Sequence, residues 1–151
     1  MPERFAYLSR YVRYLAEPPM FKALSNFFSG KASESAEADF PRVSTPEALE
    51  AVHQASYEAP VILFKHSRTC GISSAARRRM VALAPSSPAP IHEVVVQAER
   101  AISNQISENY AVHHQSPQLI VLHQGAAVYD TSHSQITEDN VRSAFASIET
   151  P

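Results

Sequence analysis

Three short apolar runs constrain the fold of this chain more than any other feature, because each has the length of a single strand. They read PVILFKH from Pro60, IHEVVV from Ile91 and QLIVLH from Gln118. Continuous apolar runs of this length are typical of strands that are covered on both faces. The sequence therefore predicts a sheet with helices on its two sides.

Helical patterns lie before, between and after these runs. Thr45, Pro46 and Glu47 form a helix start, with a capping hydroxyl, a proline at the first helical position and an acid in the first turn. This helix is predicted to continue to about Tyr57. Apolar residues at helical spacing predict three further helices. These are marked by Ile72, Ala75, Ala76, Met80 and Leu83, with Pro85 at the end; by Ile102, Ile106 and Tyr110; and by Val141, Phe145 and Ile148 after a capping Thr137.

A fourth strand is predicted after the third apolar run. Gln124 and Gly125 turn the chain into AAVYDTS, which reads as the antiparallel partner in a hairpin. The order becomes helix, strand, helix, strand, helix, strand, strand, helix. Alternation of strands and helices favours parallel pairing of the first three strands with right-handed crossovers. We therefore predict an α/β protein with a thioredoxin-like fold over residues 44–149, in which helices flank a mixed four-stranded sheet.

Residues 1–43 have a different character and are predicted to form an N-terminal extension and linker. The stretch GKASESAEAD from Gly30 is small, polar and acidic, as in a flexible linker. Before it, apolar residues at helical spacing are interrupted by Pro18 and Pro19. We expect a helical or disordered extension, which either docks on its own domain or meets a membrane surface or a partner. It lacks the apolar stretch of a signal peptide or a membrane span.

Composition excludes several classes of function. The net charge is -2, and the only basic cluster is Arg77 to Arg79, so no nucleic-acid partner is expected. A single cysteine excludes an internal disulfide framework and a four-cysteine zinc site, and it suits a reducing compartment, which favours a cytoplasmic location. His113, His114 and His133 have no recognisable metal-ligand spacing. Neither a metal nor a nucleotide is expected as cofactor.

That single cysteine, Cys70, lies where the first apolar run passes into the following helix. A helix N-terminus favours a thiolate through its peptide dipoles and unpaired N–H groups, and the thiolate is the form that attacks disulfides. Ser73, one turn later, has a hydroxyl and an N–H for the sulfur but cannot form a disulfide with it. This predicts one-thiol chemistry. The alternative is an inert core cysteine, which is more often found inside a strand or on an apolar helical stripe.

A second element supports this site. Ser116 and Pro117 directly precede the third apolar run, where a proline ends the incoming loop without breaking the strand ladder. In thioredoxin-like proteins the matching proline is cis and faces the active cysteine, so that its backbone pairs with an incoming disulfide chain. We expect a cis bond here.

The segments FKHSRTCGISSAA and ISNQISENYAVHHQSPQLIVLHQGAAVYDTSHSQIT, with their spacing, resemble the monothiol bacilliredoxin family over roughly residues 44–149. The resemblance implies a small reductase that removes bacillithiol from S-bacillithiolated proteins, with bacillithiol as co-substrate and a bacillithiol disulfide reductase as a further partner. It implies that Cys70 is the nucleophile and that Lys65, His66 and Ser67 form the approach to it. It also makes Ser116 and Pro117 the cis-proline element and places His133 in a late loop near the site.

The candidate site extends this assignment. Lys65 and His66 either tune the thiolate or lie at the surface at the strand end, and Arg77 to Arg79 either form a solvated helix face or attract the malate group of bacillithiol. The predicted site residues are Cys70 as nucleophile; Lys65, His66, Thr69, Gly71, Ile72 and Ser73 for thiolate stabilisation; and Arg68, Ser116, Pro117 and His133 for binding of substrate or thiol.

Gly71 keeps a second function open, because many bacilliredoxins have proline there. TCGIS is similar to the Cys-Gly-Phe-Ser site of monothiol glutaredoxins, which share a [2Fe–2S] cluster between two chains. Their glycine pair after the last strand is missing, since the corresponding stretch here reads YDTSHSQIT. A third alternative is a non-enzymatic adaptor or redox sensor of the same fold.

Overall fold

The computed structural model describes residues 39–149, and within them it contains the predicted strands and helices in the predicted order. Each observed boundary lies close to its sequence signal, since α2 begins at the proline after Thr45 and α3 begins directly after Cys70. The helices are α2 (Pro46–Glu58), α3 (Gly71–Leu83), α4 (Arg100–Asn109) and α5 (Glu138–Glu149), with short 3-10 helices η1 (Ala84–Ser86) and η2 (His133–Gln135). The strands are β1 (Val61–His66), β2 (Ile91–Val95), β3 (Gln118–His123) and β4 (Ala126–Ser132).

The four strands form one mixed sheet in the order β2-β1-β3-β4. Strand β1 is parallel to β2, whereas β3 is antiparallel to both β1 and β4. The expected parallel direction of the third strand is therefore wrong. The strand register explains why, because Val95 lies beside His66 and Gln118 lies beside Lys65. Strands β1 and β2 both finish at this end of the sheet. After α4 the chain returns to the same end, so β3 starts beside the last residues of β1 and runs in the opposite direction.

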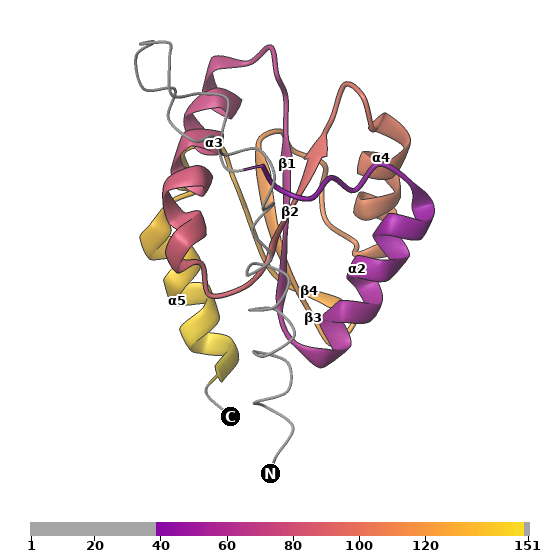
Figure 1. The fold of residues 1–151 in the computed structure, drawn as a ribbon, viewed down its shortest axis with the longest axis vertical. Helices are drawn as coiled ribbons and strands as arrows, with labels where there is room; N and C mark the ends of the chain where they lie inside the picture. The colour runs from indigo at the N-terminus through magenta and orange to yellow at the C-terminus, as the bar shows by residue number, and fades with distance from the viewer. Residues whose placement is uncertain (1–38, 150–151) are drawn as a thin grey trace, which may run out of the picture. The chain divides into compact units, whose positions relative to one another are not determined.

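Helices cover both faces of the sheet (Figure 1), as the apolar runs predict. All six residues of β1 are buried, and successive side chains enter opposite cores. Ile62 and Phe64 pack on the side of α3 and α5, whereas Val61 and Leu63 pack on the side of α2 and α4. A two-sided core of this kind is what makes a continuous apolar strand stable.

The segment just before α2 adds to the sheet. Phe40 and Val43 are buried, and backbone hydrogen bonds join Val43 N to Glu93 O at 2.9 Å and Glu93 N to Pro41 O at 2.8 Å. Residues 40–43, which the sequence suggests are part of the linker, thus cover the free edge of β2 and protect it. The rest of the proposed extension lies outside the described residues. Between residues 39 and 149, no helix is long and apolar enough to cross a membrane.

The hairpin between β3 and β4 turns at the predicted residues. Gln124 and Gly125 both have positive φ, 52° and 77°, which is the backbone that tight two-residue hairpin turns require. The turn is held by α2, because Gln124 N donates to Ser56 O at 2.7 Å and Gly125 N donates to Ser56 Oγ at 3.0 Å. The end of α2 therefore fixes the turn that sets the register of β4.

Candidate active site

Cys70 occupies the N-cap position of α3 and is a partly exposed free thiol. Its Sγ makes no capping hydrogen bond of standard geometry. The backbone N–H of Ser73 and then that of Ile72 nevertheless lower the pKa of the Cys70 thiol; the Ser73 hydroxyl adds to this, and burial opposes it. The thiol thus has the exposure and the electrostatic environment that thiolate chemistry needs.

Ser73 is fully buried and has a second contact besides its effect on the sulfur. Its Oγ accepts a hydrogen bond of 3.1 Å from the N–H of Ser67, the first residue after β1. One hydroxyl therefore connects the loop before the cysteine to the helix after it. Ile72, by contrast, is 55% exposed and presents an apolar side chain beside the thiol.

Gln97, which the sequence analysis did not single out, supports the loop between β1 and α3. Its side chain accepts from Arg68 N at 3.3 Å and donates to Thr69 Oγ1 at 3.1 Å, and it also donates to Ser67 Oγ. Thr69 N donates to Ser67 Oγ as well, at 3.3 Å. Gln97, which follows β2 and lies 27 positions after Cys70, therefore holds the loop that carries Cys70. The contact exists because β1 and β2 pair in parallel, so that both strands end at the same place.

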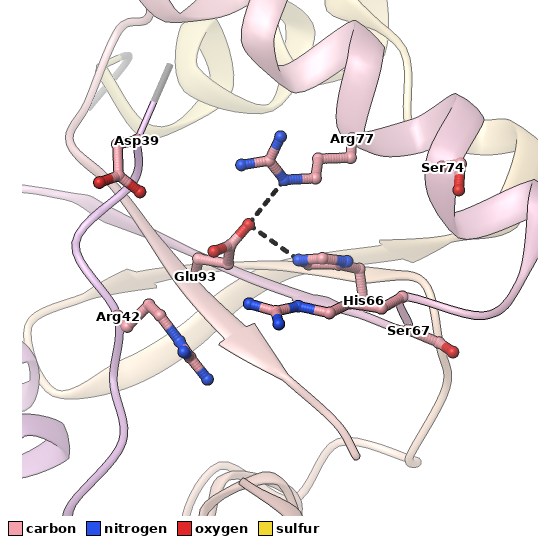
Figure 2. A pocket seen from close by; sticks show the side chains of 8 residues that line it. Asp39, Arg42, His66, Ser67, Ser74, Arg77 and Glu93 are labelled. Carbon is pink, nitrogen blue, oxygen red and sulfur yellow. Dashed lines mark hydrogen bonds and ion pairs between the residues drawn. The ribbon is translucent and has the colours of Figure 1, made fainter. Parts of the chain in front are cut away.

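A buried charged cluster lies on the α3 side of β1 (Figure 2). Glu93 Oε1 accepts a hydrogen bond of 2.8 Å from Arg77 Nε, and the same oxygen lies 2.8 Å from His66 Nε2. Burial would raise the pKa of Glu93, but hydrogen bonds from His66 and Arg77 and their charges outweigh it and lower this pKa to about 2. His66, only 3% exposed, is therefore not a surface residue. A charged residue inside the run IHEVVV was the sequence signal for this cluster.

Lys65 points to the opposite face and is fully buried, so a surface position is wrong for it as well. Its Nζ lies 2.9 Å from His114 Nδ1 and donates to Gln118 Oε1 at 3.1 Å. Weaker hydrogen bonds of 3.4 Å reach Ser103 O and Ser107 Oγ in α4. Burial lowers the pKa of Lys65 to about 8. Its positive charge is thus held among oxygen and nitrogen acceptors at the end of β1.

The expected cis bond joins Ser116 to Pro117 directly before β3. Because β3 is antiparallel to β1, this bond lies at the end of the sheet where β1 finishes and the Cys70 loop begins. His133 N donates to Pro117 O at 3.1 Å, and η2, which begins with His133, contacts α3. The structure therefore gathers the predicted residues at one edge, and their roles in binding stay predictions.

Other basic groups lie outside this arrangement. Arg78 and Arg79 are exposed on α3, and among residues 39–149 no group of three or more histidine, cysteine, aspartate or glutamate side chains has the geometry to hold a metal ion. His113 and His114 are exposed, and the ring of His114 also contacts Lys65.

Comparison with known proteins shows a family match and a shared fold. The family model described as monothiol bacilliredoxin BrxC matches residues 41–141. A candidate oxidoreductase with a thioredoxin fold is similar to this chain with 27% identity and a TM-score of 0.64, over 70% of this chain and 92% of the other. Thioredoxin from Trypanosoma brucei brucei has 15% identity and a TM-score of 0.61, over 80% of this chain and 100% of its own. Thioredoxin from Fasciola hepatica has 16% identity and a TM-score of 0.59, over 72% of this chain and 98% of its own. The two thioredoxins share the fold.

Proposed function

The chain belongs to the monothiol bacilliredoxin family, and from this premise we propose that it is a thiol–disulfide oxidoreductase that removes bacillithiol from S-bacillithiolated proteins. Cys70 is the nucleophile and bacillithiol is the co-substrate. A reducing compartment, the cytoplasm, is the location that keeps this thiol reduced. Residues 44–149 carry the activity, together with the segment 40–43 that packs on β2.

The observation that carries this proposal is the position of Cys70 at the start of α3. A partly exposed thiol whose pKa is lowered by two backbone N–H groups has the properties of a reactive cysteine rather than of a core cysteine. The stabilisation comes from the backbone of Ser73 and Ile72, so it exists wherever this helix turn is formed. Family membership then supplies the class of disulfide.

The reaction is an exchange of one disulfide for another. The Cys70 thiolate attacks the bacillithiol sulfur of the mixed disulfide, the bond between that sulfur and the substrate protein breaks, and the protein sulfur leaves with the electron pair and takes up a proton. Bacillithiol is then bonded to Cys70. A second thiol, of low molecular weight or in a partner reductase, attacks this bond, is itself joined to bacillithiol, and returns Cys70 to its reduced form.

A direct test uses a purified protein that carries bacillithiol on one cysteine. The wild-type chain should remove the bacillithiol mass from the substrate and gain it on Cys70, as read by intact mass spectrometry. Cys70→Ser should leave the substrate modified, because this sequence contains no other cysteine. Ser143→Ala is the matched control, since it removes an exposed hydroxyl from α5, a helix that carries none of the candidate site residues. Release of bacillithiol by Cys70→Ser would disprove the assignment.

A further inference from the structure

A polar cavity of about 750 Å³ lies beside the Cys70 loop. This volume is within the range of roughly 300 to 1,000 Å³ that is usual for small-molecule sites. Figure 2 shows the side chains around it, which come from β1, the loop after β1, β2, α3 and the segment before α2. The lining residues are Asp39, Arg42, His66, Ser67, Arg68, Ser74, Arg77 and Glu93.

The cavity wall is connected to the nucleophile on both sides. Ser67 and Arg68 precede Cys70 by three and two residues, and a chain of three residues spans at most about 11 Å. Ser74 follows it by four residues, and both the N–H and the Oγ of Ser74 donate to the backbone oxygen of Cys70, at 3.0 and 3.2 Å. A small molecule joined to Cys70 through its sulfur is therefore close enough to place its remaining atoms in this cavity.

The charges of the lining favour an anion. Three arginines line the cavity, against the two carboxylates of Asp39 and Glu93. Glu93 is already engaged by Arg77 and His66. Arg42 pairs with Glu99 through Nη2, and the rest of its partly exposed guanidinium makes no other hydrogen bond among residues 39–149. The planar guanidinium groups of arginine match the geometry of carboxylates in two-point hydrogen bonds.

Arg68 differs from the other two arginines because its side chain has no partner among residues 39–149. It is exposed, and within residues 39–149 its guanidinium makes no hydrogen bond or ion pair, although its backbone N–H is held by Gln97. A carboxylate that enters the cavity therefore meets this group without having to displace a partner on the described part of the chain. Glu93, Arg77 and His66 line the same cavity, where the charge of the Glu93 carboxylate is already balanced by its two partners.

We propose that this cavity binds the carboxylate-bearing part of the low-molecular-weight thiol while its sulfur exchanges with Cys70, and that Arg68 and Arg42 recognise the carboxylates. This inference rests on the proposed function, which makes the thiol bacillithiol and its anionic part the malate group. The arginines thus select for an acidic thiol and hold it in line with the nucleophile. The substrate protein, by contrast, is left to the surface around Ile72, whose side chain is exposed.

The first experiment compares two small disulfides. The Cys70 thiolate attacks one sulfur of bacillithiol disulfide, forms the mixed disulfide and releases one bacillithiol thiolate; hydroxyethyl disulfide reacts in the same way but carries no charge. We expect Arg68→Gln to lower the ratio of the two rate constants, bacillithiol disulfide over hydroxyethyl disulfide, by about tenfold, the effect of one lost charge-assisted hydrogen bond. Arg42→Gln should act in the same direction. Arg78→Gln, an exposed arginine of α3 outside the cavity, should leave the ratio unchanged.

The second experiment separates the cavity from the thiol chemistry. Glucosaminyl malate, which has the malate group but no thiol, is titrated into the Cys70→Ser protein and followed by NMR. We expect saturable binding that weakens about tenfold when Arg68→Gln is added and that is unaffected by Arg78→Gln.

The outcomes distinguish the two proposals. If wild type reacts with hydroxyethyl disulfide but not with bacillithiol disulfide, the proposed function fails. Binding of glucosaminyl malate to Cys70→Ser then still tests whether the cavity binds carboxylates. If the mixed disulfide forms but the Arg68 and Arg42 variants match the Arg78 control, the cavity assignment is overturned. Absence of glucosaminyl malate binding to Cys70→Ser overturns it as well.

Discussion

Lys65, the fifth residue of β1, lies opposite Gln118, the first residue of β3, and the Lys65 Nζ donates a 3.1 Å hydrogen bond to the Gln118 Oε1. The Gln118 side chain in turn donates to His113 O at 2.9 Å and accepts from Gln115 N at 3.2 Å. A buried lysine therefore organises the loop that leads into β3. The loop before Pro117 and the strand before Cys70 are thus tied together by one side chain.

Lys65→Met should change the pH dependence of stability. The folded pKa of Lys65 is lowered to about 8 from its usual 10.5, so between these values the unfolded chain binds more protons and the stability contributed by this group rises with pH. The free energy of unfolding of wild type minus that of Lys65→Met should therefore increase from pH 8 to 10.5, by up to about 3 kcal/mol. Urea unfolding at a series of pH values measures it, and a difference that stays constant contradicts the buried charge.

Glu93→Gln should be less stable than wild type near neutral pH and should lose this difference in acid. The pKa of Glu93 is lowered to about 2 from its usual 4.5, so its contribution is fully present above about pH 4.5 and is lost as the pH falls towards 2. We expect wild type to be more stable than Glu93→Gln by up to about 3 kcal/mol near neutral pH, with the gap closing between pH 4.5 and 2. Urea unfolding of both proteins tests this. Glu138→Gln, which removes an exposed acid of α5, is the control and should show no such convergence.

Cys70 should react as a thiolate at a lower pH than an unperturbed cysteine. The N–H groups of Ser73 and Ile72 lower its pKa, so the midpoint of the alkylation rate against pH should lie below that of the same thiol in the urea-unfolded chain. Ser73→Ala keeps the N–H and removes only the hydroxyl, so it should raise the midpoint slightly. Equal alkylation midpoints in the folded and the unfolded protein would contradict activation of Cys70 by the helix.

Alanine should change the stability of the protein differently at Gly71 and Gly125, the two glycines among residues 39–149. Gly125 has φ 77°, and an added Cβ would lie 2.2 Å from the Tyr57 hydroxyl oxygen, so Gly125→Ala should cost about 1 to 3 kcal/mol. A Cβ added to Gly71 would have no other atom within 4 Å, so Gly71→Ala should be neutral or should stabilise the fold by up to about 1 kcal/mol. Thermal unfolding measures both, and an equal loss in the two variants would contradict the assigned backbone geometry.

Local features of the sequence were sufficient for the elements themselves. The two-sided burial of β1, the start of α2 at Pro46 and the turn at Gln124 and Gly125 all depend on a few neighbouring residues. The placement of Cys70 at the start of α3 has the same origin, because the end of an apolar strand and the first turn of a helix are both visible along the chain. Periodicity, capping and turn chemistry act over these short distances.

The tertiary structure alone decided how these elements meet. The direction of β3 depends on the edge at which the chain returns after α4, which strand and helix alternation does not specify, and this direction sets Lys65 beside Gln118. Glu93 reaches His66 and Arg77 only because β2 pairs with β1 and α3 covers that face. Buried charges are stable only when partners from distant segments converge on them. The sequence by itself therefore determined that Cys70 lies at the start of a helix, whereas long-range packing decided its charged surroundings and the cavity beside it.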